Sequence, residues 1–308
     1  MKNVFDVLVL GGGPGGYTAA MYAARSGLRT LVLERLAAGG QMALTHQVDN
    51  YPGFEEGVDG FSLGQKMQQG AERFGAETVY ADVESVELRG SIKKLHTDQD
   101  TFYGRTVIVA TGANPRKLGL PMEQELTGRG VHYCAACDGM FYRGKTVVLV
   151  GGGNSAVADA LVLARLAKKV ILVHRRDTLR ASKIYHEQLQ QTENVEFRWN
   201  SEVTELLHDN RLNGVRIRNK LTGEEESVAV DGLFISVGRA PATALFEGQL
   251  ELDEAGYILA GESTATNLPG VYAVGDVRTK AVRQIVTATA DGAVAAHHIE
   301  EYLISAVA

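Results

Sequence analysis

A glycine-rich segment near the amino terminus constrains the fold of this chain most strongly. An apolar run over residues 4–10 leads into Gly11, Gly13 and Gly16, in the pattern G-x-G-x-x-G, and an alanine-rich stretch follows. This order predicts a buried parallel strand that enters a helix through a tight turn. The glycines would let a pyrophosphate approach the backbone at the helix amino terminus. The next predicted strand ends at Glu34, whose carboxylate can accept hydrogen bonds from a ribose 2′-hydroxyl.

The same arrangement recurs near the middle of the chain. An apolar run over residues 146–150 leads into Gly151, Gly153 and Ala156, and a second alanine-rich stretch follows. The next predicted strand ends at His174, and the offset from the first glycine to the strand end is 23 positions in both copies. A single glycine pattern is weak support for a nucleotide site, whereas two copies in strand–helix–strand context are strong support.

The residues at the two strand ends differ in charge. The acid Glu34 would repel a 2′-phosphate, whereas Arg175 and Arg176, with Arg180 one turn further on, can hold one through charge-assisted hydrogen bonds. We therefore predict two dinucleotide sites, one for FAD or NAD and one for NADP(H). Taken alone, each glycine pattern could be a turn that binds no ligand, and the arginines could be a solvated run of charges. The offset that the two copies share argues against both alternatives.

Two further strand ends fit a flavin nucleotide at the first site. Residues 106–116 contain a predicted strand followed by Thr111 and Gly112, and residues 267–277 contain one followed by Asp276. Doubly wound sheets bind their ligands at the carboxyl ends of such strands. On spacing alone, Asp276 could equally be an ordinary turn aspartate.

The order of these segments predicts an α/β fold with two Rossmann-like dinucleotide-binding domains, one inserted into the other. Residues 1–112 and 243–308 would form the FAD-binding domain, and residues 113–242 would form the inserted NADPH-binding domain with the cysteine pair. Alternating apolar and polar residues predict small antiparallel meanders within 78–103 and 195–235.

The only two cysteines, Cys134 and Cys137, are followed directly by Asp138. A zinc site would need two further ligands, and His132 is too close in sequence to complete an ordinary one. A structural disulfide would close a very short loop and remove little unfolded-state entropy. A catalytic dithiol is the interpretation we favour, with Asp138 as proton donor and acceptor, because opening a disulfide requires a proton for the leaving thiolate.

Composition excludes several classes of protein. The 308 residues carry a formal net charge of −6, which argues against a general nucleic-acid binder. No apolar run approaches the roughly 18 residues needed to span a membrane, and residues 1–10 lack the features of a signal peptide. We therefore expect a cytoplasmic protein, where a Cys-x-x-Cys pair is more often redox-active or metal-binding than structural.

Across nearly its whole length, the chain resembles the low-molecular-weight, bacterial-type thioredoxin reductases of the pyridine nucleotide–disulfide oxidoreductases. The resemblance rests on "GGGPGGYTAAMYAAR", "ATGANPR", "CAACDG", "GGGNSAV", "HRRDTLRA", "GVYAVGDV" and "RQIVTATADGAVAA". Two positions depart from the family pattern: Ala135-Ala136, where the family often has Ala-Thr, and Ala158-Asp159, where two glutamates are common. The second departure concerns the nicotinamide site.

The resemblance implies that electrons pass from NADPH to FAD, then to the Cys134–Cys137 disulfide, and then to thioredoxin or a thioredoxin-like small dithiol protein. Cys137 would face the flavin, Cys134 would attack the partner's disulfide, and Asp138 would be the acid–base group. It also implies a homodimer, with no metal, and an inserted domain that swings so that the nicotinamide site and the cysteines reach the flavin in turn.

The resemblance also assigns cofactor-binding residues. The expected FAD site comprises Gly11, Gly13, Pro14, Gly16, Glu34, Gly40, Gln41, Asn50, Thr111, Gly112, Asp276, Arg283 and Gln284. The expected NADPH site comprises Gly151, Gly153, Asn154, Ser155, Ala156, His174, Arg175, Arg176 and Arg180.

Three other functions compete with this one. A ferredoxin or flavodoxin reductase would share the two domains but lack Cys-x-x-Cys-Asp. A long peroxiredoxin reductase would need an amino-terminal extension with its own thiol pair. A non-enzymatic redox sensor would have no use for the phosphate-binding Arg175-Arg176 pair, and steady NADPH oxidation with a disulfide substrate would distinguish it from an enzyme.

Overall fold

The structure is a computed structural model that describes residues 4–45, 47–181 and 183–305. The chain divides into two compact units, of which unit 1 comprises Met1–Asn114 and Ala240–Ala308, and unit 2 comprises Pro115–Arg239. These boundaries lie two and three residues from the sequence-based expectation. None of the described helices combines the length and the apolar character needed to cross a membrane.

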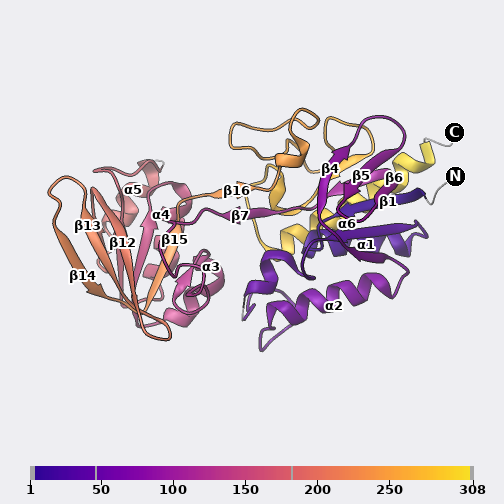
Figure 1. Cartoon of the computed structure of the whole chain (residues 1–308). Helices are drawn as coiled ribbons and strands as arrows, with labels where there is room; N and C mark the ends of the chain where they lie inside the picture. Colours follow the sequence, from indigo (N-terminus) through magenta and orange to yellow (C-terminus); the bar gives the residue numbers. More distant parts are fainter. Residues whose placement is uncertain (1–3, 46, 182, 306–308) are drawn as a thin grey trace. The chain divides into compact units, whose positions relative to one another are not determined.

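Unit 1 is built on a seven-stranded sheet (Figure 1). Its path runs β3-β2-β1-β6-β5-β4, and β17 also pairs with β6. The strands are β1 (Val4–Leu10), β2 (Thr30–Glu34), β3 (Glu77–Tyr80), β4 (Val83–Glu87), β5 (Lys93–Thr97), β6 (Thr101–Val109) and β17 (Val271–Ala273). The first three strands, β6 and β17 pair in parallel, which leaves the carboxyl ends of β1, β2, β6 and β17 along one edge.

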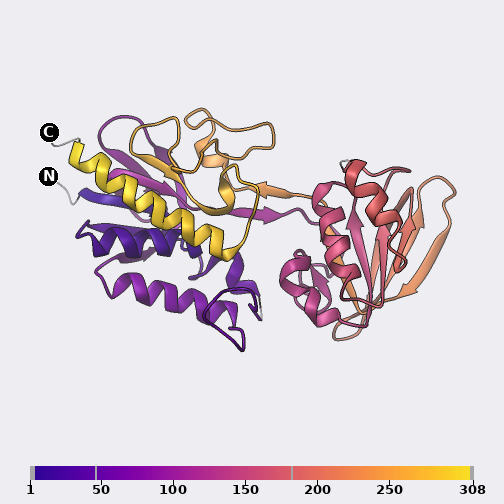
Figure 2. The same cartoon turned by 180° about the vertical axis from the view of Figure 1, so that it is seen from behind.

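Both faces of this sheet are buried, because alternate side chains of β1 enter different clusters. Val7 and Val9 pack with alanines of α1 (Pro14–Arg25) and α6 (Ile285–Ser305). Leu8 and Leu10 pack instead against the antiparallel strands β4 and β5 and the chain after residue 240. Figure 2 shows α6 (yellow) lying along the helical face beside α1, with α2 (Gly60–Glu72) next to them. This packing accounts for the continuous apolar run of β1.

The expected meander within 78–103 is smaller than predicted. β3 pairs with β2 in parallel and extends the main sheet, so only β4, β5 and the start of β6 are antiparallel. Apolar and polar residues alternate in the same way in parallel and antiparallel strands, so the sequence pattern does not distinguish the two kinds of pairing.

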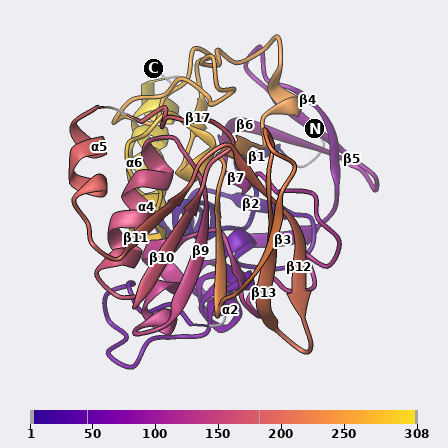
Figure 3. The same ribbon diagram turned by 90° about the vertical axis from the view of Figure 1, so that its left-hand side faces the viewer.

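Unit 2 repeats the layered plan (Figure 3). Its parallel sheet has the order β11-β10-β9-β15-β8. The strands are β8 (Val131–His132), β9 (Thr146–Gly151), β10 (Lys169–Val173), β11 (Val195–Arg198) and β15 (Gly232–Ser236). The helices α4 (Asn154–Ala164) and α5 (Lys183–Gln190) lie toward one face, and a three-stranded antiparallel sheet lies toward the other. That sheet consists of β12 (Ser201–His208), β13 (Leu212–Asn219) and β14 (Glu225–Ala229).

Side chains of β9 alternate between the two layers. Val147 and Leu149 pack with Ala160 and Leu163 of α4, whereas Val148 and Val150 pack with the β12–β13 sheet. The second expected meander is correspondingly shorter than 195–235, because β11 pairs with β10 in parallel and β15 with β9.

The two segments that connect the units, β7 (Ala113–Pro115) and β16 (Arg239–Pro241), pair with each other as a two-stranded sheet. The remaining elements are short helical turns. They are η1 (Gly40–Leu44), α3 (Ala135–Asp138), η2 (Gly139–Tyr142), η3 (Ala244–Phe246) and η4 (Gly275–Val277).

Candidate active site

The first glycine turn brings β1 and the start of α1 unusually close together. Gly11 has φ of +109°, and a Cβ placed there would lie 2.5 Å from the carbonyl oxygen of Ala110. A Cβ on Gly16 would overlap the carbonyl oxygen of Gly11. Gly13 differs, because a Cβ there would meet no atom within 4 Å. Pro14 is the first residue of α1, and no side chain caps this described helix end. The first and third glycines therefore serve packing, and the second leaves open space at the helix amino terminus.

Glu34, at the end of β2, is held against this turn. Its Oε2 accepts a hydrogen bond from the backbone N–H of Gly12 at 2.6 Å. Its Oε1 accepts hydrogen bonds from the N–H groups of Arg35 at 2.9 Å and Leu36 at 3.1 Å. These three hydrogen bonds fix the carboxylate at the end of β2, against the glycine turn.

Two further loops of unit 1 carry polar amides, and one of them lies beside the glycine turn. A Cβ on Gly40 would lie 3.5 Å from the Cα of Gly13. The next residue, Gln41, donates a hydrogen bond from Nε2 to Oδ1 of Asn114 at 2.9 Å. Asn50 donates from Nδ2 to Oε1 of Gln284 at 3.0 Å, which ties its loop to the start of α6.

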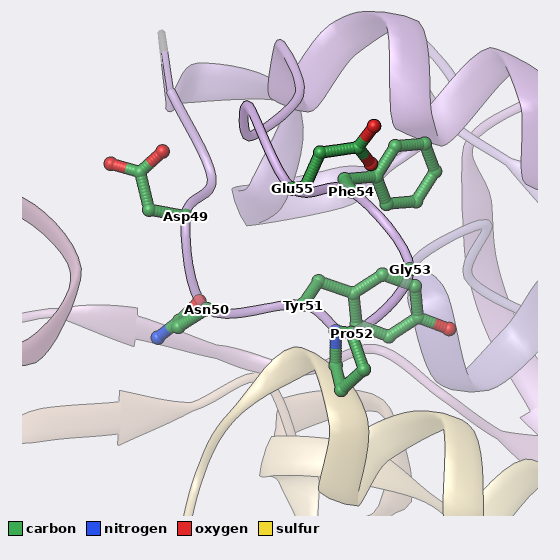
Figure 4. Close-up of a pocket in the computed structure, with 7 residues that line it drawn as sticks. All are labelled: Asp49, Asn50, Tyr51, Pro52, Gly53, Phe54 and Glu55. Carbon is green, nitrogen blue, oxygen red and sulfur yellow. The ribbon is translucent and has the colours of Figure 1, made fainter.

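The loop that carries Asn50 encloses an open hollow of about 510 Å³, lined by residues 49–55. Figure 4 shows the rings of Tyr51 and Phe54 facing each other across it, with Asn50 beside the start of α6. The two ring centroids lie 6.2 Å apart. Asn50 and Gln284 thus lie together although they are more than 200 residues apart in the sequence. This proximity is expected if both residues contact the flavin.

Thr111 and Gly112 both engage the chain that returns to unit 1. Thr111 donates its hydroxyl to the carbonyl oxygen of Ala242 at 2.8 Å, and the carbonyl oxygen of Gly112 accepts from the N–H of Ala242 at 3.0 Å. Both residues therefore have a structural role in addition to their position at the carboxyl end of β6.

Asp276 lies in η4, next to a buried ion-pair network. Asp291 of α6 accepts hydrogen bonds from Arg278 Nη2 at 2.7 Å, Lys280 Nζ at 2.8 Å and the N–H of Gly275 at 2.8 Å. Burial alone would raise the pKa of Asp291, but these three donors together hold it below its usual value. The network holds the backbone of η4 at the carboxyl end of β17.

Arg283 lies where the chain enters α6, with its guanidinium carbon 4.1 Å from the centroid of the Tyr257 ring. Its Nη2 donates to the carbonyl oxygen of Arg278 at 3.4 Å. Its Nε is buried and has no hydrogen-bond partner among the described residues. A buried N–H without an acceptor is costly, which fits a binding site for an external acceptor.

The second glycine turn repeats the geometry of the first. A Cβ on Gly151 would lie 2.6 Å from the Cβ of Ala156, and Ala156 is fully buried. A Cβ on Gly153 would meet no atom within 4 Å. Asn154 and Ser155 are exposed at the start of α4. The same division of roles therefore holds, with packing at the first and third positions and open space at the second.

His174 occupies the position that Glu34 has in unit 1. Its ring lies where a Cβ on Gly152 would be, and its Nε2 lies 3.1 Å from the carbonyl oxygen of Thr178. Burial lowers the pKa of His174, and the positive charges of three nearby arginines lower it further, opposed by the Thr178 carbonyl. Its environment is that of a neutral packing residue rather than a charged phosphate ligand.

The three arginines near His174 are Arg175, Arg176 and Arg180, and their side chains are exposed. Within the described residues, none of them forms an ion pair with an acid. The backbone N–H of Arg180 donates to the carbonyl oxygen of Gly152 at 2.7 Å, which holds Arg180 beside the glycine turn. The structure thus gathers three guanidinium groups at the second turn, where the first turn has a carboxylate.

Cys134 and Cys137 form a disulfide at the start of α3, with Cα atoms 5.3 Å apart. Both cysteines are partly exposed. The next residue, Asp138, places Oδ2 3.0 Å from Nδ1 of the buried His132. The disulfide, the carboxylate and an imidazole therefore lie together in unit 2.

Asp159 links this motif to α4. Burial raises the pKa of Asp159, whereas hydrogen bonds from Ser236 and the N–H of Ala135 and the charge of Arg239 oppose the rise. Ala135 is buried and Ala136 is exposed. Asp159, which is shorter than the glutamate common in the family, thus contacts the backbone of the cysteine motif at Ala135.

The profile of the pyridine nucleotide-disulphide oxidoreductase family matches residues 5–292. This chain belongs to that family. The thioredoxin reductase of Streptomyces clavuligerus is 47% identical over 306 residues, which cover 98% of this chain and 95% of that protein. The thioredoxin reductase of Bacillus subtilis (strain 168) is 44% identical over 303 residues, with 98% and 96% covered. The crystal structure of thioredoxin reductase from Streptococcus pyogenes MGAS5005 aligns with a TM-score of 0.92 at 42% identity, covering 99% of this chain and 100% of that one.

As a pyridine nucleotide-disulphide oxidoreductase, the protein is an enzyme that uses FAD and NADPH and acts on disulfides. Its residues fit both cofactors. Each unit offers open space at an uncapped helix amino terminus, beside Gly13 in one and Gly153 in the other. Arg283 Nε, which has no partner in the part of the chain that the structure describes, and the exposed arginines after His174 are consistent with anionic ligands.

Sequence reasoning missed several residues that position the site of this oxidoreductase. Asp291 holds η4 through Gly275, 16 residues away in the sequence. Glu123 accepts hydrogen bonds from Tyr133, next to Cys134, and from three backbone N–H groups. The sequence offers His132 only as a metal ligand, whereas the structure places it in contact with Asp138 and Tyr142. Burial of these charged or polar groups is the signal that identifies them, and a sequence does not display it.

Proposed function

We propose that this oxidoreductase reduces the disulfide of thioredoxin or a thioredoxin-like small dithiol protein, in the cytoplasm and as a homodimer. One observation carries the proposal: the Cys134–Cys137 disulfide, followed by Asp138, lies in the same unit as the arginine-bearing glycine turn. The names of the relatives support thioredoxin as the substrate.

We assign FAD to unit 1 and NADPH to unit 2. Three features support FAD in unit 1: the open space at Gly13, the hydrogen-bonded carboxylate of Glu34, and Arg283 Nε, to which no described residue is an acceptor. The open space at Gly153 and the guanidinium groups of Arg175, Arg176 and Arg180 support NADPH in unit 2. The other expected contacts, from Gly40, Gln41, Asn50, Thr111, Gly112, Asp276 and Gln284 in unit 1 and from Asn154 and Ser155 in unit 2, belong to the same proposal.

In this mechanism, the bound nicotinamide and flavin supply the electron pair that opens the Cys134–Cys137 disulfide. Two electrons and two protons convert that disulfide into two thiols, and Asp138 delivers one of the protons. The Cys134 thiol then gives its proton to Asp138, and the thiolate attacks one sulfur of the partner's disulfide. The partner's S–S bond breaks, a mixed disulfide forms, and the other partner sulfur leaves as a thiolate that takes up a proton. The Cys137 thiolate attacks Cys134, which restores the internal disulfide and releases the partner as a dithiol.

Steady-state kinetics test the function. Purified holoenzyme with oxidised thioredoxin should consume one NADPH for each disulfide reduced, and NADH should be a much poorer reductant. A protein that retains FAD but oxidises no NADPH with thioredoxin, glutaredoxin or a comparable dithiol protein would contradict the proposal.

Single cysteine variants test the assignment of the two thiols. Cys137→Ser removes the resolving thiol, so Cys134 should accumulate as a mixed disulfide with thioredoxin, visible on a nonreducing gel. Cys134→Ser should form no such adduct under the same conditions. Accumulation of the adduct in Cys134→Ser instead would reverse the two roles.

A further inference from the structure

Asp138 does not stand alone beside the cysteine pair, because it is the first member of a buried chain of polar side chains. His132, on β8, places Nδ1 3.0 Å from Oδ2 of Asp138. On the other side of the imidazole, Nε2 lies 2.6 Å from the hydroxyl of Tyr142, at the end of η2. Both nitrogens of His132 therefore have a partner, and the ring connects the carboxylate to the phenol.

The imidazole is held in place by its surroundings. Its side chain is 7% exposed, and the ring stacks on Phe234 with centroids 5.2 Å apart. The Tyr142 ring meets His132 edge-on, also at 5.2 Å. β8 pairs with β15, which sets His132 opposite Phe234 in the register. A Cβ on Gly232 of β15 would overlap the Tyr142 ring, so this glycine makes room for the phenol.

The direction of the hydrogen bonds follows from the donors available. Burial raises the pKa of Tyr142 to about 12, so the phenol keeps its proton near neutral pH. An ionised carboxylate only accepts hydrogen bonds, so Oδ2 of Asp138 accepts from Nδ1 of His132 at 3.0 Å. Nε2 of a neutral imidazole is then an acceptor, and the Tyr142 hydroxyl donates to it at 2.6 Å. The proton of a neutral imidazole is then on Nδ1, directed at Oδ2 of Asp138.

We propose that His132 is a positioning residue for Asp138, donating from Nδ1 to Oδ2 so that the proton Asp138 transfers is carried by Oδ1. This inference rests on the proposed role of Asp138 in disulfide opening. Because Oδ2 is occupied by a donor, only Oδ1 can hold a proton without breaking the bond to His132. Tyr142 acts through His132 by donating to Nε2, which selects the Nδ1–H tautomer.

The tautomer itself gives a test that does not depend on turnover. In ¹⁵N-histidine-labelled oxidised holoenzyme, the His132 ring should show a protonated Nδ1 and an unprotonated Nε2, with its signals assigned by their loss in His132→Asn. If the spectrum shows the opposite tautomer, which is the commoner one in water, the proposal is overturned. No measurement of enzyme activity is needed for this test.

Variants of His132 separate positioning from packing. His132→Phe keeps a stacked ring but has no donor, whereas His132→Asn loses the ring but retains an N–H near the place of Nδ1. The readout is the reduction of the Cys134–Cys137 disulfide by dithiothreitol, quenched with iodoacetamide and counted by mass. His132→Phe should slow this step on the order of 10- to 100-fold, and His132→Asn should recover most of the rate. His297→Asn, at a histidine that is 69% exposed on α6, serves as the control.

A double variant completes the test. If His132 acts through Asp138, then His132→Phe combined with Asp138→Asn should be no slower than Asp138→Asn alone. Additive losses, a His132→Phe rate equal to wild type, or a His132→Asn rate as low as that of His132→Phe would each overturn the proposal. If wild-type enzyme instead fails to reduce thioredoxin with NADPH, the proposed function fails, whereas the dithiothreitol reaction still reports on His132.

Discussion

At the scale of single residues, the glycines of the two turns have different tasks although they share one motif. The first and third positions are filled up to the van der Waals limit by neighbouring backbone or Cβ atoms, as at Gly11 and Gly16. The middle position, at Gly13 and Gly153, has free space around it. The motif therefore combines a constraint on folding with a constraint on ligand binding, and substitutions should separate the two.

Gly13→Ala and Gly16→Ala form a matched pair. Gly16 lies within α1, where alanine would ordinarily stabilise by about 1 kcal/mol. Here the overlap with the carbonyl oxygen of Gly11 should outweigh that gain, so we expect a lower melting temperature for the FAD-free protein. Gly13→Ala should leave that melting temperature nearly unchanged but weaken FAD retention. Calorimetry and flavin titration measure the two effects, and equal melting temperatures for both variants would contradict this division of tasks.

Asp291 allows a second prediction for a single residue. Asp291→Asn leaves the buried cation of Arg278 without its counter-ion and should destabilise the protein by about 3–5 kcal/mol in urea unfolding. Because the folded pKa of Asp291 is depressed, its contribution is complete above the unfolded value of about 3.9 and is lost as the pH falls below it. The acid limb of the stability curve should therefore flatten in Asp291→Asn. An unchanged acid limb would show that other carboxylates cause the acid sensitivity.

At the scale of elements, the residues that end β2 and β10 distinguish the two nucleotide sites. Glu34 and His174 both lie against the middle of their glycine turn, but one is a carboxylate bonded to Gly12 and the other a neutral ring over Gly152. The positive charge of the second site therefore comes from the residues after His174, not from His174 itself.

The double variant Arg175→Ala, Arg176→Ala should raise KM for NADPH on the order of 100-fold or more, because two charge-assisted hydrogen bonds to the 2′-phosphate are lost. KM for NADH, which lacks that phosphate, should change little. Arg165→Ala, at the exposed carboxyl end of α4, removes a charge from the opposite end of the helix and serves as control. A similar rise for both cofactors would refute selection by these arginines.

The strand–turn–helix elements were predictable because their signals are local. Apolar runs, glycine spacing and strand-end charge all lie within about 25 residues of each other in each copy. The direction of β3 and β11 was not predictable, since alternation does not distinguish parallel from antiparallel pairing. The contacts of Asp291 and Arg283 were not predictable either, because they depend on which buried groups the tertiary fold brings together.

At the scale of the whole molecule, each unit has its own core. The buried clusters around Val148 and Leu149 consist only of unit 2 residues, and those around Leu8 and Val9 consist only of unit 1 residues. The chain passes between the units twice, through β7 and β16, which pair with each other. An inserted unit whose two ends lie together can in principle be removed without disturbing its host.

We therefore expect residues 115–239, expressed alone, to fold cooperatively and to bind NADPH. The complementary protein, with Asn114 joined to Ala240 by a short glycine linker, should fold and retain FAD. Urea unfolding and cofactor titration of the two fragments measure this. Failure of either fragment to show a cooperative transition would mean that the units stabilise each other more than their separate cores indicate.

The short span of the Cys134–Cys137 disulfide has a consequence for the life of the protein in a cell. Closing so small a loop removes conformational entropy from the unfolded chain, which stabilises the fold by only roughly 2 kcal/mol. The bond can therefore be broken and remade in every cycle while the surrounding fold persists. Proteases and chaperones recognise unfolded chains, and a difference of roughly 2 kcal/mol changes the unfolded fraction by about 30-fold, so the reduced form should be degraded faster than the oxidised form. A cell short of reductant, in which the Cys134–Cys137 disulfide stays closed, should then keep this enzyme longer than a cell with ample reductant.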